Sequence, residues 1–197
     1  MKTCLLSAAL LLLAVRPGWA DNLIVNGSFE SYDPSAGIDY GSYIRFFSPP
    51  PNTGITGWII TGSSGGNPNN VDLAHSFLWP AFDGNESLDM EGAEGASGVI
   101  CQSFATTPGT TYTLSFAYGN NPGDSGATMN VLVMGADVLL DQDVSHNTST
   151  FADMDYTLFS ADFTADADSA TLQFSALTNS GYGIVLDAVS VEEGGGG

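Results

Sequence analysis

Short runs of apolar, β-branched and aromatic residues recur along this sequence, and clusters of glycine, proline, asparagine and aspartate separate them. Within the runs, apolar and polar residues alternate with a period of two, which is typical of β-strands that bury one face. Residues 111–118 show the pattern well, with small side chains on one face and four large ones on the other: Tyr112, Leu114, Phe116 and Tyr118. No stretch has the 3.6-residue period of an amphipathic helix of ordinary length.

The pattern predicts strands over residues 23–25, 58–61, 71–73, 87–90, 99–104, 111–118, 128–134, 138–141, 156–164, 170–176 and 183–191. Many short strands at this spacing indicate an all-β fold, and we predict an antiparallel β-sandwich of the jelly-roll type. Residues 21–191 suit a single domain with one core. Two polar segments, residues 31–57 and 62–70, are expected to be long loops, which are usually functional or mobile.

Both ends of the chain carry segments that are predicted to lie outside this domain. Residues 1–20 resemble a secretory signal peptide, with Lys2 before an apolar run and small residues, Gly18 and Ala20, at the cleavage positions. The apolar run is shorter than the roughly 20 residues that span a bilayer. We therefore predict a secreted protein, extracellular or at the cell surface, that begins at Asp21 and does not insert into a membrane. Residues 192–197 have the composition of a linker.

Removal of the signal peptide leaves Arg45 as the only lysine or arginine against 22 acidic residues, a net charge of about −21. Nucleic acid and anionic lipid are excluded as partners because both require several basic residues to displace counterions. The surplus of carboxylates is compatible with solubility in a salty medium and with calcium binding.

No catalytic residue can be assigned. The segment Gly62-Ser63-Ser64-Gly65-Gly66 formally matches the Gly-x-Ser-x-Gly pattern of a nucleophilic serine. That pattern requires a strand before the serine and a helix after it, whereas this segment reads as a polar loop. The 22 acidic residues always yield carboxylate pairs, but no motif places two of them at a separation suited to glycoside cleavage.

Aromatic residues supply the candidates for ligand binding. Tyr40 and Tyr43 lie in the long polar segment, where a ring can stack on a sugar and a phenol can add a hydrogen bond. Trp79 lies outside any clear alternation and is the third candidate, and Arg45 is the one strong cation that could pair with an acidic sugar. Trp58, at the head of a predicted strand, is expected to be a core residue instead.

Several short motifs occur in an order that resembles a known family. The chain is similar to the choice-of-anchor C proteins of bacteria and to the related plant cell-wall domain of unknown function 642, which have a galactose-binding-like jelly roll. The resemblance extends over residues 22–191 and rests on these segments: Asn22-Leu-Ile-Val-Asn-Gly-Ser-Phe-Glu30, Gly57-Trp58, Val71-Asp-Leu73, Asp83-Gly84, Ser87-Leu-Asp-Met90, Thr107-Pro-Gly-Thr-Thr-Tyr-Thr113, Leu186-Asp187 and Val189-Ser-Val191.

A structural calcium ion is the predicted cofactor. The terminal strands of a sandwich tend to lie close together, so Glu30 and Asp187 are expected to approach each other and to share a cation. Calcium takes six to eight oxygen ligands, and the backbone carbonyls of Gly27 and Ser31 are candidates for further positions. The first and last motifs also resemble those of carbohydrate-binding jelly rolls that hold calcium. Alternatively, Glu30 and Asp187 accept hydrogen bonds from turns and bind no ion.

These observations favour a non-enzymatic module that binds carbohydrate, with neutral polysaccharide preferred because the negative charge opposes a polyuronate. Two alternatives stay open: a structural or adhesive surface protein without sugar specificity, and a glycoside hydrolase.

Overall fold

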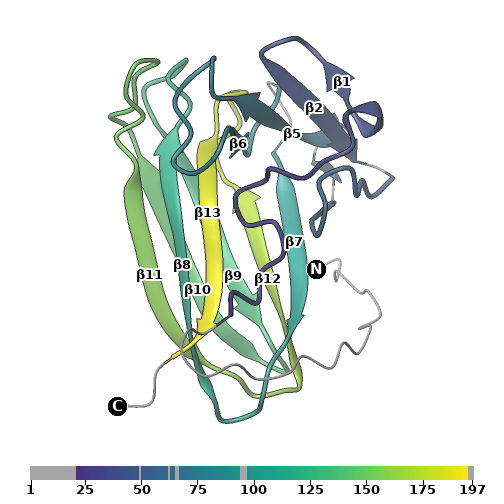
Figure 1. The fold of residues 1–197 in the computed structure, drawn as a ribbon, viewed down its shortest axis with the longest axis vertical. Coiled ribbons are helices and arrows are strands. Elements are labelled where there is room, and N and C mark those ends of the chain that lie inside the picture. Colours follow the sequence, from purple (N-terminus) through teal and green to yellow (C-terminus); the bar gives the residue numbers. More distant parts are fainter. Residues whose placement is uncertain (1–20, 49, 62, 65–66, 94–96, 195–197) are drawn as a thin grey trace.

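Two antiparallel sheets packed face to face make up the computed structural model, which describes residues 21–48, 50–61, 63–64, 67–93 and 97–194 (Figure 1). The larger sheet runs in the order β1 (Ile38–Asp39), β2 (Tyr43–Ser48), β5 (Asn67–His75), β6 (Glu86–Asp89), β13 (Ile184–Glu193), β8 (Thr111–Asn120) and β11 (Thr157–Thr164), with β4 (Ser63–Ser64) paired to β5. The smaller sheet runs in the order β10 (Val138–His146), β9 (Ala127–Met134), β12 (Ser169–Ala176), β7 (Val99–Ala105) and β3 (Ile59–Ile60). One short 3-10 turn, η1 (Pro34–Ala36), precedes β1. The predicted antiparallel β-sandwich is confirmed.

The core lies between the sheets and is built from the apolar face of each strand. Trp58 is 1% exposed, and its ring packs against those of Phe29 and Phe174 with centroids 5.6 and 6.1 Å away. Its indole N–H donates to the carbonyl of Asn26 at 3.0 Å, so the buried polar atom is satisfied. The prediction of Trp58 as a core residue is therefore confirmed.

The predicted strand over residues 23–25 is wrong. The chain there runs beside β13, with the Leu23 N–H donating to the Val191 carbonyl at 2.8 Å, but forms no strand and turns at Asn26. Asn26 and Phe29 adopt left-handed φ angles of 57° and 62°. The Asn26 side chain bonds to the backbone of Ser31 on both sides, and these local bonds replace a strand ladder.

The expectation that residues 31–57 and 62–70 form long loops is also wrong in part. The segments η1, β1 and β2 lie within the first range, and β4 and the start of β5 lie within the second. Ile44 and Phe46 of β2 point into the core, and Tyr43 and Arg45 point away from it. The flanking glycines and prolines concealed this short alternation. Figure 1 shows β2, β5 and β6 at one end of the sandwich, beside the loops that join the long strands.

The predicted signal peptide and the predicted linker, at the two ends of the chain, lie largely outside the residues that the structure describes. The predicted signal peptide, residues 1–20, is not described, and neither are residues 195–197 of the predicted linker. Glu192 and Glu193 continue β13. Among the described residues, no helix is long and apolar enough to span a membrane.

Candidate functional site

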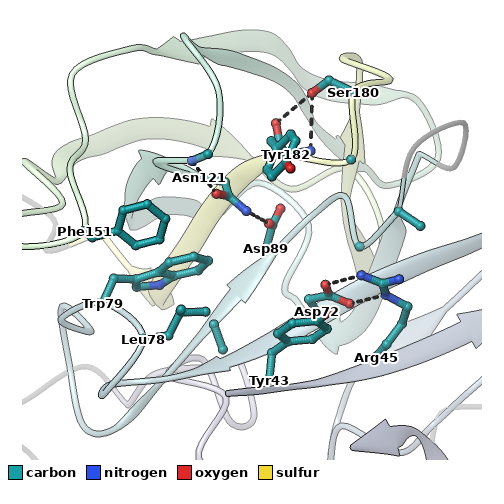
Figure 2. A pocket seen from close by; sticks show the side chains of 15 residues that line it. Tyr43, Arg45, Asp72, Leu78, Trp79, Asp89, Asn121, Phe151, Ser180 and Tyr182 are labelled. Atoms are coloured by element: carbon teal, nitrogen blue, oxygen red, sulfur yellow. Dashed lines mark hydrogen bonds and ion pairs between the residues drawn. The ribbon is translucent and has the colours of Figure 1, made fainter. Parts of the chain in front are cut away.

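A pocket of about 380 Å³ opens on the outer face of the larger sheet, the face turned away from the smaller sheet (Figure 2). The alternation of each strand produces this face. In β5, for example, Val71 and Leu73 enter the core, so that Asp72 and Ala74 point outward into the pocket. Loops that follow β5, β8, β10 and β12 form the walls.

A row of three charged side chains crosses the floor on adjacent strands. Arg45 of β2 pairs in register with Asp72 of β5, which pairs in turn with Asp89 of β6. Arg45 holds Asp72 through two bonds, from Nε to Oδ1 at 2.7 Å and from Nη2 to Oδ2 at 2.8 Å. Such a bidentate pair fixes both side chains.

Asp89 sits at the centre of the pocket and is 1% exposed. Its Oδ1 accepts the backbone N–H groups of Glu91 and Gly183, both at 2.9 Å, and its Oδ2 accepts the Asn121 side-chain amide at 2.6 Å. In the part of the chain that the structure describes, no cation contacts this carboxyl group. Asp89 therefore ties β6 to the loops after β8 and β12.

Burial changes the acidity of both carboxyl groups on the floor. Burial raises the pKa of Asp72 to about 7, although the Arg45 guanidinium acts in the opposite direction. Burial, and then the charge of Asp72, raises the pKa of Asp89 to about 8. The floor therefore changes charge near neutral pH.

Apolar side chains form the walls. A small cluster separate from the main core contains Ala74, Trp79, Met154 and Val185, with Tyr43, Leu78 and Tyr156 packed against it. The Trp79 indole N–H donates to Ser87 Oγ at 2.9 Å, and its ring packs against Phe151 at 6.4 Å. In Figure 2, Trp79 and Phe151 lie on the opposite side of Asp89 from Tyr43 and Arg45.

The loop between β12 and β13 presents Tyr182 above the floor (Figure 2). The Oε2 atom of Glu91, which follows β6, accepts the N–H groups of Ser180 and Gly181 at 3.0 and 3.2 Å. The Tyr182 N–H donates in turn to Ser180 Oγ at 3.3 Å. The residues that end β6 therefore supply one floor residue and hold the loop that carries Tyr182.

The structure brings the four predicted ligand-binding residues together. Tyr43, Arg45 and Trp79 line the pocket. Tyr40 stacks on Tyr43, with ring centroids 5.0 Å apart and planes at 22°, and the Arg45 guanidinium carbon lies 5.3 Å from each ring centroid. Trp79 is only 4% exposed, so it supports the wall and does not present an open face.

The pocket also contains residues that the sequence analysis does not name as candidates, among them Asp72, Asp89, Asn121, Phe151 and Tyr182. The alternation of apolar neighbours around Asp72 and Asp89 already placed both on an outer face. The other three lie in or beside loops, where no pattern marks orientation.

The predicted metal residues meet at residues 82–86, which are the end of the loop between β5 and β6 together with Glu86, the first residue of β6. Glu30 Oε1 accepts the N–H groups of Asn85 and Glu86, both at 2.7 Å. Asp187 Oδ2 accepts those of Phe82 and Asp83 at 2.8 and 3.0 Å. Both carboxylates thus hold the same loop by hydrogen bonds.

The predicted backbone ligands also have hydrogen-bond partners. The Gly27 carbonyl accepts the Val189 N–H at 3.0 Å, and the Ser31 carbonyl accepts the Thr56 N–H at 2.9 Å. Among the described residues, no group of three or more His, Cys, Asp or Glu side chains is arranged to hold a metal ion. The structure therefore places two carboxylates, Glu30 and Asp187, at one segment, which is fewer ligands than the six to eight oxygens that calcium takes, and the calcium ion stays a prediction.

The serine motif lacks the context of a nucleophile. Ser63 and Ser64 form β4, which pairs in antiparallel fashion with Asn67 and Pro68 of β5. Within the described residues a strand, not a helix, follows these serines.

Comparison with known proteins gives one family and one curated relative. The family model described as "Protein of unknown function (DUF642)" matches residues 22–192. Halomucin of Haloquadratum walsbyi is 32% identical over 177 residues, which cover 87% of this chain. The chain spans about 2% of the length of that relative.

Solved structures share the fold. A structure of TmCBM61 in complex with β-1,4-galactotriose matches with a TM-score of 0.58 and 14% identity, over 89% of this chain and 100% of that chain. The enzymatically active domain of tailspike protein 4 from bacteriophage CBA120 matches with a TM-score of 0.53 and 13% identity, over 87% of this chain and 21% of that chain. At these identities the likeness concerns the fold alone, a jelly-roll sandwich as predicted.

Proposed function

We propose that this chain, which belongs to the DUF642 family, is a non-catalytic module that binds carbohydrate in the pocket on the outer face of its larger sheet. The observation that carries the proposal is the composition of the pocket: exposed aromatic rings stand around a floor of fixed hydrogen-bonding groups. A sugar ring has an apolar face that stacks on an aromatic ring and hydroxyl groups that need polar partners.

Different pocket residues are suited to stacking on a sugar ring and to hydrogen bonding with its hydroxyl groups. Tyr182 and Phe151 offer exposed rings at the rim. Asn121 and Arg45 supply donors, and Asp72 supplies acceptors. Arg45 and Asp72 are fixed by their mutual bonds, and Asn121 is fixed by its bond to Asp89. Preorganised polar groups favour binding because few rotamers must be frozen when the ligand arrives.

We expect the ligand to be a neutral polysaccharide. Arg45 is the only lysine or arginine after residue 20, and it is already paired with Asp72 on the pocket floor. A uronate carboxylate would therefore meet no uncommitted cation in the pocket and would be repelled by the charge of the whole chain. Stacking on Tyr182 or Phe151 involves no such repulsion.

Two finer proposals accompany binding. The first is export, with processing before Asp21, which N-terminal sequencing of the exported protein tests. The second is a structural calcium ion held by Glu30 and Asp187. Glu30 uses only Oε1 for its bonds to the loop, which leaves Oε2 as the oxygen that would bind the ion.

A glycan array probed with the folded protein, followed by calorimetric titration of the best ligand, tests the main proposal. Tyr182→Ala and Asn121→Ala should each weaken binding about tenfold or more, because each removes a direct contact. Val138→Ala, an exposed apolar residue of β10 in the other sheet, is the matched control and should bind as the unmodified chain does. A silent array, or undiminished binding by both pocket variants, would refute the proposal; a silent array with self-association in sedimentation would favour the adhesive alternative.

Glycoside hydrolysis is a second candidate because Asp72 and Asp89 share one pocket and both have raised pKa values. The bonding of Asp89 argues against it, since this carboxyl group is buried and accepts three N–H groups. Release of reducing sugar that disappears in Asp72→Asn would establish the hydrolase instead.

A further inference from the structure

Exposed aromatic side chains gather around the pocket. Among the described residues, five aromatic side chains are between 43% and 74% exposed: Tyr40, Phe77, Phe82, Phe151 and Tyr182. Phe151 and Tyr182 line the pocket itself, and Phe77 precedes the lining residue Leu78. Water-exposed aromatic surface is unfavourable, and its concentration on one face of a soluble domain marks a binding surface.

One row of aromatic side chains, the first arm, leads from the pocket at the start of β2 into the turn between β1 and β2. Tyr43 lines the pocket, and Tyr40 stacks on it farther out, with one ring face against Tyr43. Half of Tyr40 remains exposed, although nothing in the core requires a ring at that position. Arg45 lies beside both rings and is held by Asp72, so the arm is fixed in place.

A second arm leads away through the loop between β5 and β6. Tyr156 packs on the small cluster that contains Trp79, and its hydroxyl donates to the Pro80 carbonyl at 3.3 Å. Phe82 meets the edge of the Tyr156 ring at a centroid distance of 5.7 Å and is 48% exposed. The backbone on either side of that ring is fixed, because Asp187 accepts the N–H groups of Phe82 and Asp83.

We propose that the pocket is the central subsite of a longer surface, and that the ligand is an internal segment of a linear polysaccharide that crosses the pocket and stacks on Tyr40 at one side and Phe82 at the other. The inference rests on the proposed function. A cavity of about 380 Å³ is near the lower end of ligand pockets, roughly 300–1,000 Å³, so it holds a short segment of such a chain. A monosaccharide bound in the pocket would leave both arms without a role.

The two arms make the surface suited to a chain that continues in both directions. Figure 2 shows Tyr43 and Arg45 on one side of the pocket and Trp79 and Phe151 on the other, with Asp89 between them. A ligand bound by its end would use one arm at most. An internal segment uses both, and the arms add affinity without a change in the central contacts.

The test is calorimetric titration with oligosaccharides of increasing length, from disaccharide to hexasaccharide, in four neutral β-1,4-linked series: galactan, mannan, xylan and cellulose. The unmodified chain should bind longer members of at least one series more tightly than the disaccharide. Tyr40→Ala and Phe82→Ala should each lower affinity for the hexasaccharide about threefold to tenfold, the worth of one stacked ring. Neither variant should change affinity for the disaccharide.

Two controls separate the arms from the pocket. Tyr182→Ala should weaken binding at every length, and Val138→Ala should weaken it at none. Reduction of the chain end to an alditol should leave hexasaccharide affinity unchanged, since the end is not the bound part. Thermal melts of Tyr40→Ala and Phe82→Ala should match the unmodified chain because both side chains are exposed.

Two results would overturn the extended surface while leaving a carbohydrate-binding pocket. One is an affinity that is already maximal with the disaccharide. The other is a loss of affinity in Tyr40→Ala and Phe82→Ala that is equal at all oligosaccharide lengths. Absence of binding in all four series and on the array would overturn the proposed function as well.

Discussion

Asp89→Asn tests whether the buried carboxyl groups on the pocket floor make stability depend on pH. The substitution keeps the size of the side chain and an oxygen that can accept the Glu91 and Gly183 N–H groups. It removes the ionisable carboxyl group of β6 that lies opposite Asp72 on the paired strand β5. In the unmodified chain the Asn121 amide N–H donates to Asp89 Oδ2. In the variant, the Asn121 amide must turn over so that its oxygen accepts the side-chain N–H of the new asparagine.

The sign follows from the direction of the pKa changes. Asp89 and Asp72 have folded pKa values of about 8 and about 7, while an aspartate in the unfolded chain titrates near ~3.9. Between these values the folded chain binds protons that the unfolded chain has released, so the free energy of unfolding falls as pH rises. The stabilisation is complete below about pH 4 and is lost as pH rises through 7 and 8.

The magnitude is large enough to measure. Each pKa unit corresponds to about 1.4 kcal/mol, so the buried carboxyls together make a difference on the order of several kcal/mol. Hydrogen bonds lower the pKa values of some exposed carboxylates, such as Asp33 and Asp166. These groups change the free energy of unfolding in the opposite direction, and they do so only as the pH falls toward their pKa values. Measurement between pH 5 and 8 avoids that range.

Urea unfolding at pH 5, 6, 7 and 8, at constant ionic strength, gives the free energy of unfolding for each variant. The unmodified chain should be more stable at pH 5 than at pH 8, and Asp89→Asn should flatten the dependence. Asp168→Asn removes an exposed carboxylate between β11 and β12 and should retain the full dependence. Equal stability of the unmodified chain at pH 5 and 8, or an unchanged slope in Asp89→Asn, would refute the reasoning.

Three further predictions concern the core, the ion pair and the metal. Trp58→Ala should lower the free energy of unfolding by about 3–5 kcal/mol in urea titration because the ring is buried, and a loss under about 1 kcal/mol would contradict its core role. Arg45→Met alone should cost about 3 kcal/mol by leaving Asp72 unpaired, and Arg45→Met with Asp72→Asn should recover part of that loss in a double-mutant cycle; strictly additive losses would argue against coupling. Chelation should lower the melting temperature if calcium binds, since a ligand at a hundredfold excess over Kd adds about 2.7 kcal/mol, and Glu30→Ala or Asp187→Ala should abolish the difference. An unchanged melt with chelator in low salt would leave these carboxylates as acceptors of loop N–H groups alone.

Local alternation was sufficient to predict most strands of the sandwich. In β8 the buried side chains Tyr112, Leu114 and Phe116 alternate with less buried ones as expected, because a strand that buries one face needs only a period of two. Trp58, a large aromatic residue at the head of a predicted strand, is in the core as predicted. These predictions depend on neighbours in the chain, which the sequence contains directly.

Errors occurred where side chains compete with the strand ladder or where turn residues surround a short strand. The side chains of Asn22 and Asn26 bond to nearby backbone, which ends the regular pattern at the start of the chain. The strand β2 has only six residues, and Gly41 and Pro49 stand close to its two ends, so the alternation of Ile44 and Phe46 is too short to outweigh the turn signals. Burial against the opposite sheet, which no local pattern records, decides the second case.

The candidate site depended on register between strands far apart in the sequence. Alternation alone places Asp72 and Asp89 on outer faces, but only the pairing of β5 with β6 sets them opposite each other. The ring chemistry of Tyr40, Tyr43 and Trp79 makes them candidates, but their assembly at and beside one pocket depends on loops that fold over that face. The sequence therefore offered the right kinds of residues without their arrangement.

The placement of Arg45 links the composition of the chain to the ligand we propose. A chain with one arginine after residue 20 has one guanidinium with which to bind an acidic sugar, and the register of β2 with β5 commits that group to Asp72. To bind a uronate, Arg45 would have to leave Asp72 beside Asp89, two buried carboxyl groups without a cation. Such an exchange is unfavourable, because an unpaired buried charge costs more than a new exposed pair returns. The same ion pair therefore stabilises the floor and disfavours acidic ligands, so the preference for neutral sugar follows from the fold of β2 and not from net charge alone.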